Sequence, residues 1–216
     1  MAADPLDPQR TCLLFFDTGK LFVNGPSLDA TDRRDDVRHA VGQWVRQLEA
    51  ARRLDMMVAY AQTAQRGDQT NYFPRLMDLT EDMEPYPPGV RRPMSRAVIG
   101  TPEVATIDEI APGPGDYVFY KERWDPWHLT TFELSLRRRG IDTIIVNGGS
   151  TEIGIVATVY GAHRLDFDTV VVSDGCTSKY ADNQDVLMRS IFPRVGRVRT
   201  TEQVLDMLQA GQGSDS

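Results

Sequence analysis

Two ionisable side chains and one turn of small residues stand where a folded chain could use them together. Asp17 follows the apolar run at 11–16, and Lys121 follows the apolar run at 117–120. The turn "NGGSTEIGIV" at 147–156 follows a further apolar run and leads into a segment with the pattern of a helix. A carboxyl group can give or take a proton, an ammonium group can hold charge, and N–H groups at a helix start can bind an oxyanion. These are the parts of an acid–base site.

The three positions fall at the ends of strands in an alternating pattern of strands and helices. Continuous apolar runs such as "TCLLFF" are typical of central parallel strands that are covered on both faces. Apolar residues recur at intervals of three and four over about 32–54, which predicts an amphipathic helix. The patterns predict strands at 11–16, 56–60, 117–120, 143–146, 169–172 and 197–200, and helices at 32–54, 128–139, 151–164, 181–191 and 202–210.

This alternation predicts the α/β class. We expect a single-domain, doubly wound parallel sheet in three layers (α/β/α), with right-handed crossovers. Ligands bind such sheets at the carboxyl ends of the strands. That rule points to Asp17, Lys121 and the turn at 148–154 as parts of one site.

The chain of 216 residues is long enough for one well-filled α/β domain. We expect this domain to run over 11–210, after an N-terminal tail at 1–10 and before a disordered tail, "GQGSDS", at 211–216. The stretch at about 62–116 holds eight of the thirteen prolines and has little sustained period. Because so long an irregular stretch is uncommon unless it has a function, it predicts a lid or a subunit-contact excursion, with short helical pieces near 72–79.

Charge and hydropathy argue against several classes of partner. The formal net charge of −7 and the isoelectric point near 5.0 argue against nucleic acid or an anionic membrane as the main partner. No apolar run approaches the roughly 18 residues that a membrane span needs. The start, "MAADPLDPQR", lacks the basic lead and the apolar stretch of a signal peptide. We therefore expect a cytoplasmic protein that acts on a small molecule.

The spacing of residues predicts neither a metal nor a cofactor. Cys12 and Cys176 are far apart, and none of the three histidines stands at ligand spacing from another. The turn at 149–154 lacks the lysine of a phosphate-binding loop, and its glycine spacing differs from that of a dinucleotide-binding loop. We expect a site that contains protein groups alone.

Taken in order, the motifs resemble those of the isochorismatase-like hydrolase superfamily, which includes cysteine hydrolases such as nicotinamidases and N-carbamoylsarcosine amidases. "DTGKLF" resembles D-x-Q-x-x-F, and "KERWDPWHLT" resembles K-x-x-x-S-A-F-x-x-T. "GGSTEIGIVATVYGA" resembles G-x-x-T-x-x-C-V-x-x-T-x-x-x-A. The resemblance covers nearly the whole chain. It implies that Asp17 is the general acid and base, that Lys121 is its partner, and that Gly154 stands at the position of the nucleophilic cysteine.

The departures from the family pattern bear directly on the chemistry. Glycine at position 154 has no side chain, so the thioester route is closed there. The true isochorismatases similarly resemble "GVYAHIGC" over this turn, with glycine at the cysteine position, and they cleave a vinyl ether without a covalent intermediate. This chain has Thr151-Glu152 where that branch has Ala-His. The D-x-H-x-x-H motif of the zinc-binding members is missing from "AQTAQRGDQ", which supports the expectation of no metal.

The resemblance implies roles for the residues around the turn. Asp17 supplies and accepts the proton, and Lys121 holds charge beside it. Glu152 either reaches into the pocket, to activate water or bind the substrate, or is placed in the first helical turn for its dipole alone. Gly154 leaves space and an exposed N–H. The residues expected to contact the substrate are Trp127, Gly149, Ser150, Thr151, Ile153 and Asp125.

Three functions stay open on the sequence alone. The first is a hydrolase that cleaves a vinyl ether, ester or carbamate type of bond by water attack, without a cysteine nucleophile. The second is a catalytically inactive family member that serves as a ligand-binding or assembly subunit. The third, an amidase that uses directly activated water, suffers because amides need a strong nucleophile. The retained pair of Asp17 and Lys121 favours the first. The resemblance also implies a homodimer or homotetramer.

Overall fold

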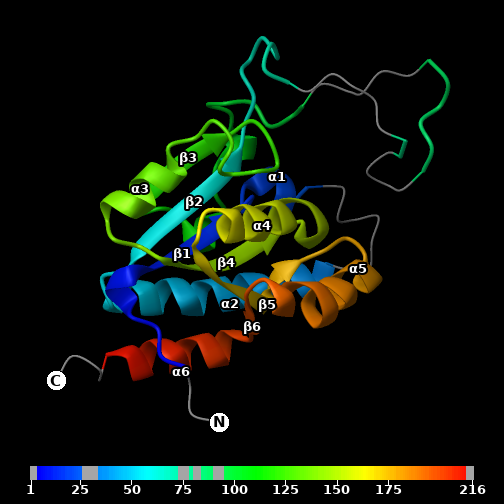
Figure 1. The fold of residues 1–216 in the computed structure, drawn as a ribbon. Helices are drawn as coiled ribbons and strands as arrows, with labels where there is room; N and C mark the ends of the chain where they lie inside the picture. The colour runs from blue at the N-terminus through cyan, green and yellow to red at the C-terminus, as the bar shows by residue number, and fades with distance from the viewer. Residues whose placement is uncertain (1–3, 26–33, 73–77, 80–83, 90–94, 213–216) are drawn as a thin grey trace.

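A six-stranded parallel sheet forms the centre of the computed structural model, which describes residues 4–25, 34–72, 78–79, 84–89 and 95–212 (Figure 1). The strand order is β3-β2-β1-β4-β5-β6, and every neighbouring pair is parallel. The strands are β1 (Thr11–Phe16), β2 (Met57–Thr63), β3 (Tyr117–Lys121), β4 (Thr143–Gly149), β5 (Asp168–Thr177) and β6 (Arg197–Arg199). The doubly wound α/β sheet expected from the sequence is confirmed.

Helices cover both faces of the sheet (Figure 1). Helices α2 (Arg34–Arg53) and α6 (Thr201–Gly211) pack on one face, and α3 (Phe132–Arg138) and α4 (Val156–Arg164) pack on the other. The other helical segments are α1 (Lys20–Val23), α5 (Ala181–Val186), the π-helical η5 (Thr151–Ile155) and η6 (Leu187–Ile191), and the 3-10 turns η1 (Pro8–Arg10), η3 (Pro102–Val104), η4 (Asp108–Ile110) and η7 (Phe192–Arg194). None of the helices in the described ranges combines the length and the apolar character that crossing a membrane requires.

Strand β1 contributes to two hydrophobic cores, one on each face of the sheet. All six of its residues are buried, as the apolar run predicts. Because side chains alternate along a strand, Leu13 and Phe15 lie in the core under α2 and α6. Cys12, Leu14 and Phe16 lie in the core under α3 and α4. Phe15 and Phe16 therefore have the same burial on opposite faces of the sheet.

Several elements differ in extent from the sequence-based prediction. Strand β2 continues past residue 60, because Gln62 and Thr63 pair with the end of β3. The sequence did not predict this extension, since both residues are polar. Helix α3 begins only at Phe132, because Leu129 has a φ of 55°, outside the helical region, and residues 128–131 form turns. Strand β5 extends to Thr177, since its last residues pair with the end of β4.

Part of the proline-rich stretch packs against the body of the domain. Ile107 and Ile110 are buried in the core under α2, and the Ile107 N–H donates to the carbonyl of Thr18 at 3.1 Å. The helical pieces expected near 72–79 lie mainly outside the described residues, as do residues 213–216 of the tail expected at 211–216. Gly211, the first residue of that tail, is instead the buried last residue of α6. A lid or contact role for this stretch stays a prediction.

Trp127 is a core residue. The residue is 8% exposed, and the centroid of its ring lies 4.9 Å from the ring centroid of Phe132 and 5.4 Å from that of Phe167. The indole N–H donates to the carbonyl of Thr158 in α4 at 3.0 Å. The indole also passes so close to α4 that a Cβ at Gly161 would lie 2.2 Å from its Cδ1. The ring therefore joins the loop before α3 to α4, and a contact of Trp127 with substrate stays a prediction.

The close approach of Trp127 predicts opposite effects for the same substitution at two helical glycines. Gly161→Ala should destabilise the fold by about 1–3 kcal/mol, because the new methyl group displaces the indole. Gly42→Ala is the matched control, since a Cβ there meets nothing within 4 Å, and it should stabilise α2 by about 0.5–1 kcal/mol. Urea unfolding of both variants measures the difference, and equal stabilisation by both would contradict this packing.

Candidate active site

The carboxyl ends of β1, β2 and β3 bring Asp17, Thr63 and Lys121 together. The Lys121 Nζ donates to the Asp17 Oδ2 at 2.8 Å and also to the Thr63 Oγ1. The Thr63 backbone N–H donates to the Asp17 Oδ1 at 2.7 Å, and the Thr63 hydroxyl donates to the Asp17 Oδ2 at 3.0 Å. The three side chains thus form a closed set of hydrogen bonds around one carboxylate.

Burial makes this pair unlike an ion pair on the surface. The Lys121 side chain is 0% exposed, whereas that of Asp17 is 11% exposed. Burial lowers the pKa of Lys121, and the neighbouring carboxylate of Asp17 opposes that change. The Lys121 ammonium therefore loses its proton more readily than a surface lysine does. Asp17, which accepts its hydrogen bond, is partly exposed to solvent.

Asp17 holds its position through its backbone as well as its side chain. Its φ of 51° lies in the left-handed region, which an aspartate tolerates better than most residues. Its N–H donates to the carbonyl of Ala61 at 2.9 Å, which continues the pairing of β1 with β2 by one residue. The carboxylate is consequently turned onto the end of β2, where Thr63 binds it.

Glycine is required where β4 passes the end of β1. Gly148 has a φ of 114°, and a Cβ there would lie 1.9 Å from the backbone oxygen of Phe16. At Gly149 a Cβ would lie 2.7 Å from the Thr177 Oγ1. At Gly148 the backbones of β4 and β1 approach closely, whereas at Gly149 the side chain of Thr177 in β5 takes the space. The pairing of Gly148 with Phe16 places the turn beside Asp17.

The turn leads into the π-helical η5, in which the carbonyl of Ser150 is the shared acceptor. It accepts from the N–H groups of Ile153, Gly154 and Ile155 at 3.2, 3.0 and 3.3 Å. The exposed N–H that the sequence predicted at Gly154 is therefore engaged. The first two N–H groups of the segment, those of Thr151 and Glu152, stand where a helix start provides no internal acceptor.

The ring of Phe16 fills the space beside Gly154. A Cβ at position 154 would lie 2.0 Å from the Phe16 Cε1 and 2.4 Å from its Cζ. The same ring faces the ammonium of Lys121, whose Nζ is 3.9 Å from the ring centroid. Phe16 thus contacts both the lysine and the position that corresponds to the family's cysteine. No side chain at position 154 fits unless this ring moves.

Two oxygens on η5 are buried without a hydrogen-bond partner among the described residues. They are the Thr151 Oγ1 and the Glu152 Oε2. Buried polar atoms are nearly always bonded, to the protein, to water or to a ligand. Ile153 is 37% exposed, so it is the outward residue of this turn. The unpaired oxygens are suited to donors that come from solvent or substrate.

Asp125 serves local structure. Its Oδ1 accepts from the backbone N–H of Trp127 at 2.8 Å, and its Oδ2 is 4.0 Å from the guanidinium of Arg164. These contacts close the turn before α3, and a contact of Asp125 with substrate stays a prediction.

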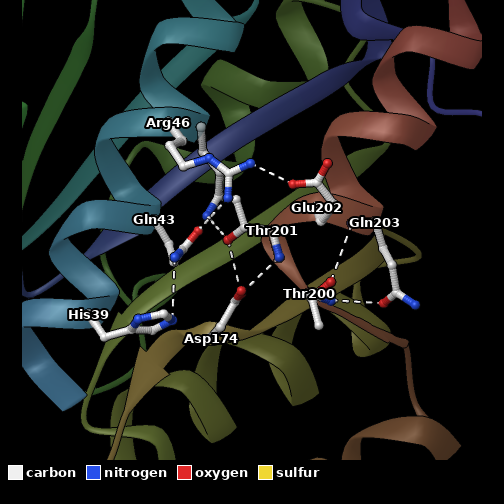
Figure 2. A network of polar contacts seen from close by, with 9 residues as sticks. His39, Gln43, Arg46, Asp174, Thr200, Thr201, Glu202 and Gln203 are labelled. Carbon is white, nitrogen blue, oxygen red and sulfur yellow. Dashed lines mark hydrogen bonds and ion pairs between the residues drawn. The ribbon is translucent and has the colours of Figure 1, made fainter.

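A buried polar network supports the turn from the opposite face of the sheet. Asn147, which precedes Gly148, exchanges amide hydrogen bonds of 2.8 and 3.1 Å with Gln47 of α2. Gln47 also donates to the Thr201 Oγ1 at 3.0 Å, and the Asp174 Oδ1 accepts from the N–H and hydroxyl of Thr201. Figure 2 shows Asp174 bonded to Thr201 at the start of α6. These bonds tie the end of β4 to α2, β5 and α6.

Three contributors to the site were missed by the sequence-based prediction. Thr63 was hidden because its strand was expected to end at residue 60, and Phe16 was assigned only to the core. Asn147 was treated as part of the turn without a partner. Pairing of the polar end of β2 with β3 is the signal that would have found Thr63. Among the described residues, no group of three or more His, Cys, Asp and Glu side chains could hold a metal ion.

The contact of Phe16 with position 154 can be measured as a coupling between two substitutions. Gly154→Ala should destabilise the protein by about 1–3 kcal/mol, because its methyl group meets the ring. In a Phe16→Leu background the same substitution should cost about 1 kcal/mol less, since the Cε1 and Cζ atoms are gone. The control background is Phe15→Leu on the opposite face, where the cost should stay as in the wild type. Equal costs in all three backgrounds, measured by urea unfolding, would be incompatible with this contact.

Comparison with known proteins agrees with this architecture. The family model named Isochorismatase domain matches residues 11–203. The chain is 36% identical over 103 residues to the uncharacterized isochorismatase family protein YwoC of Bacillus subtilis (strain 168). This match covers 48% of this chain and 54%, about half, of that relative. It is 27% identical over 201 residues to the phenazine biosynthesis protein PhzD of Pseudomonas fluorescens, covering 93% of this chain and 87% of that protein.

The fold is likewise similar to solved structures. An isochorismatase family protein from Burkholderia thailandensis superposes with a TM-score of 0.78 at 24% identity, over 95% of this chain and 98% of that one. At that identity the likeness shows the fold alone. The family model, by contrast, spans the chain from the first residue of β1 to the first turn of α6. The chain therefore belongs to the isochorismatase family.

Proposed function

We propose that this isochorismatase-family hydrolase cleaves a small organic substrate by proton transfer and water attack, without a cysteine nucleophile. The bond is of the vinyl ether, ester or carbamate type. One observation carries the proposal: the Phe16 ring takes the space that a nucleophile at position 154 would need, while Asp17 and Lys121 stay paired beside it. The relative matched over most of its length, PhzD, is named for a biosynthetic pathway, which is compatible with a small organic substrate.

Proton transfer can run along the bond between Lys121 and Asp17. The Lys121 Nζ lies 2.8 Å from the Asp17 Oδ2, so its proton can pass to the carboxylate along this hydrogen bond, which leaves both groups neutral. The protonated carboxyl, which is 11% exposed, then gives this proton to the substrate. When water attacks, its proton passes to the Asp17 carboxylate and from there to the neutral Lys121 amine, which restores the ion pair.

This sequence suits bonds that become reactive once protonated. A vinyl ether that accepts a proton on carbon becomes an oxocarbenium ion, and water captures that ion without a strong nucleophile. Esters and carbamates need more help, since negative charge develops on oxygen as water adds. The N–H groups of Thr151 and Glu152 at the start of η5 are the candidate donors for that charge.

Glu152 is the candidate group for orienting the attacking water. Its Oε2 is buried and has no partner among the described residues, so a hydrogen bond from water would satisfy it. An amidase with directly activated water is less well supported, because an amide nitrogen leaves only after attack by a stronger nucleophile. An inactive subunit is disfavoured because both members of the proton-carrying pair are in place.

Resistance to thiol alkylation with dependence on Asp17 tests the proposal. Cys12 and Cys176 are buried, and burial raises the pKa of both thiols far above the ordinary value. Iodoacetamide should leave turnover intact, and the double variant Cys12→Ala/Cys176→Ala should stay within about twofold of wild type. Asp17→Asn should lower kcat by about 10²–10⁴, the usual contribution of a general acid or base.

The substrate for this test comes from a screen of vinyl ethers, esters, carbamates and amides against the wild type, with Asp17→Asn as the control for background hydrolysis. Rapid and complete loss of activity on alkylation of one cysteine would refute the proposal. Turnover that survives Asp17→Asn unchanged would do the same.

The pH dependence follows from the sign of the change at Lys121. A lowered pKa means that the ammonium loses its proton below the ordinary value of 10.5, so kcat/KM should fall with rising pH before a surface lysine would titrate. Lys121→Met should remove this alkaline limb together with most of the activity. A profile of kcat/KM between pH 6 and pH 11 checks the expectation, which a flat alkaline side in the wild type would contradict.

A further inference from the structure

The Phe16 side chain touches two unusual features of the candidate site, the glycine at position 154 and the buried ammonium of Lys121. A Cβ at Gly154 would lie 2.0 Å from the Cε1 of the Phe16 ring, and the ring centroid is 3.9 Å from the Lys121 Nζ. The residue is 1% exposed and sits directly before Asp17 on β1. Nothing in the family resemblance assigns it a role.

We propose that Phe16 is a positioning residue of the proton-transfer site: its ring, seated in the space that glycine leaves at position 154, holds the Lys121 ammonium against Asp17 and keeps it charged. The inference rests on the proposed function, because it concerns the group that supplies the proton. It goes further by assigning the apolar residue that controls that group.

The ring can do this because its face is electron-rich. A cation within about 6 Å of the centroid is attracted to the face, and the attraction is larger where water is excluded. The Lys121 side chain is 0% exposed, so the ring substitutes for water on one side of the ammonium. An aliphatic side chain of similar volume would leave the same burial without this attraction.

The other sides of the ammonium are occupied by polar groups. The Asp17 carboxylate binds it from the end of β1, and the Thr63 hydroxyl binds it from the end of β2. Asp17 is the charged group that acts on Lys121 among the described residues. The Phe16 ring, the Asp17 carboxylate and the Thr63 hydroxyl therefore fix the position of the Lys121 ammonium.

Gly154 is what allows the ring to adopt this position. A Cβ there would lie 2.0 Å from the Phe16 Cε1, so any other residue would push the ring away from its present place over the ammonium. The glycine and the phenylalanine thus act as a pair. The absence of a side chain at position 154 makes room for the ring, and the ring in turn stabilises the ammonium form of Lys121, in which the proton for Asp17 is stored at rest.

Direct titration of Lys121 in the substrate-free protein tests this inference. The chain has three lysines, Lys20, Lys121 and Lys179, so few side-chain signals need assignment, and the Lys121 signal is identified by its loss in Lys121→Met. Phe16 is replaced with phenylalanines that carry one, two or three ring fluorines, which withdraw electrons from the face and change the volume little. The Cε chemical shift of Lys121 is followed against pH by NMR in each full-length protein.

We expect the midpoint of the Lys121 titration to fall stepwise with each fluorine, by about one pH unit at full substitution. The matched control carries the same residues at position 15, which is equally buried but faces the opposite core and stacks on Tyr60 at 5.2 Å. That series should leave the midpoint unchanged. Phe16→Leu against Phe15→Leu provides a second comparison should a fluorinated protein fold poorly.

Three results would overturn the inference. One is an unchanged titration across the position 16 series, including the case in which every protein keeps its ammonium to the highest pH at which it folds. Another is an equal change in the position 15 series. The third is a Lys121 that is neutral at pH 7 in the wild type. Since no turnover is measured, the result stands apart from the proposed function, whose failure would appear as alkylation-sensitive or Asp17-independent activity.

Discussion

The structure of the candidate site depends on one buried ion pair. Removing an ammonium from water costs on the order of several kcal/mol, and the cost is met only if the charge is well paired and its hydrogen bonds are satisfied. Lys121, with its side chain 0% exposed, has Asp17 at 2.8 Å, the Thr63 hydroxyl, and the face of Phe16 around it. The ends of three strands must therefore stay in register, because a shift of one residue would turn one of these side chains to the other face.

The rest of the architecture keeps those ends together. Gly148 lets β4 pass within contact of the Phe16 backbone, and the Asn147 amide anchors β4 to α2 and α6 on the other face. The turn before η5 is consequently held from both sides of the sheet. Residues that touch no reacting group thus determine where the N–H groups of the turn point, and the site is a property of the sheet edge as a whole.

The sequence predicts the backbone of this arrangement well and its side-chain partners poorly. Apolar runs followed by Asp17 and Lys121 are enough to place both residues at the same sheet edge, because parallel strands end together. Thr63 escaped prediction because two polar residues at the end of a strand look like a loop until their pairing with β3 is known. Trp127 and Asp125 were expected at the substrate by position in a motif, which did not reveal that the Trp127 indole bonds to α4 or that Asp125 accepts from the Trp127 N–H.

The buried ion pair and the filled space at position 154 distinguish a site with changed chemistry from a site that has lost its function. Buried ion pairs can commonly be replaced by apolar residues with no loss of stability, so folding alone does not require Lys121 and Asp17. A site that had merely lost its cysteine would keep a cavity at position 154, and cavities are destabilising in proportion to their volume. Here the volume is filled by the Phe16 ring and the charge is paired. A site that keeps the ion pair and fills the space at position 154 with a ring is what we expect of the proposed hydrolytic chemistry, and it favours an enzyme over an inactive subunit.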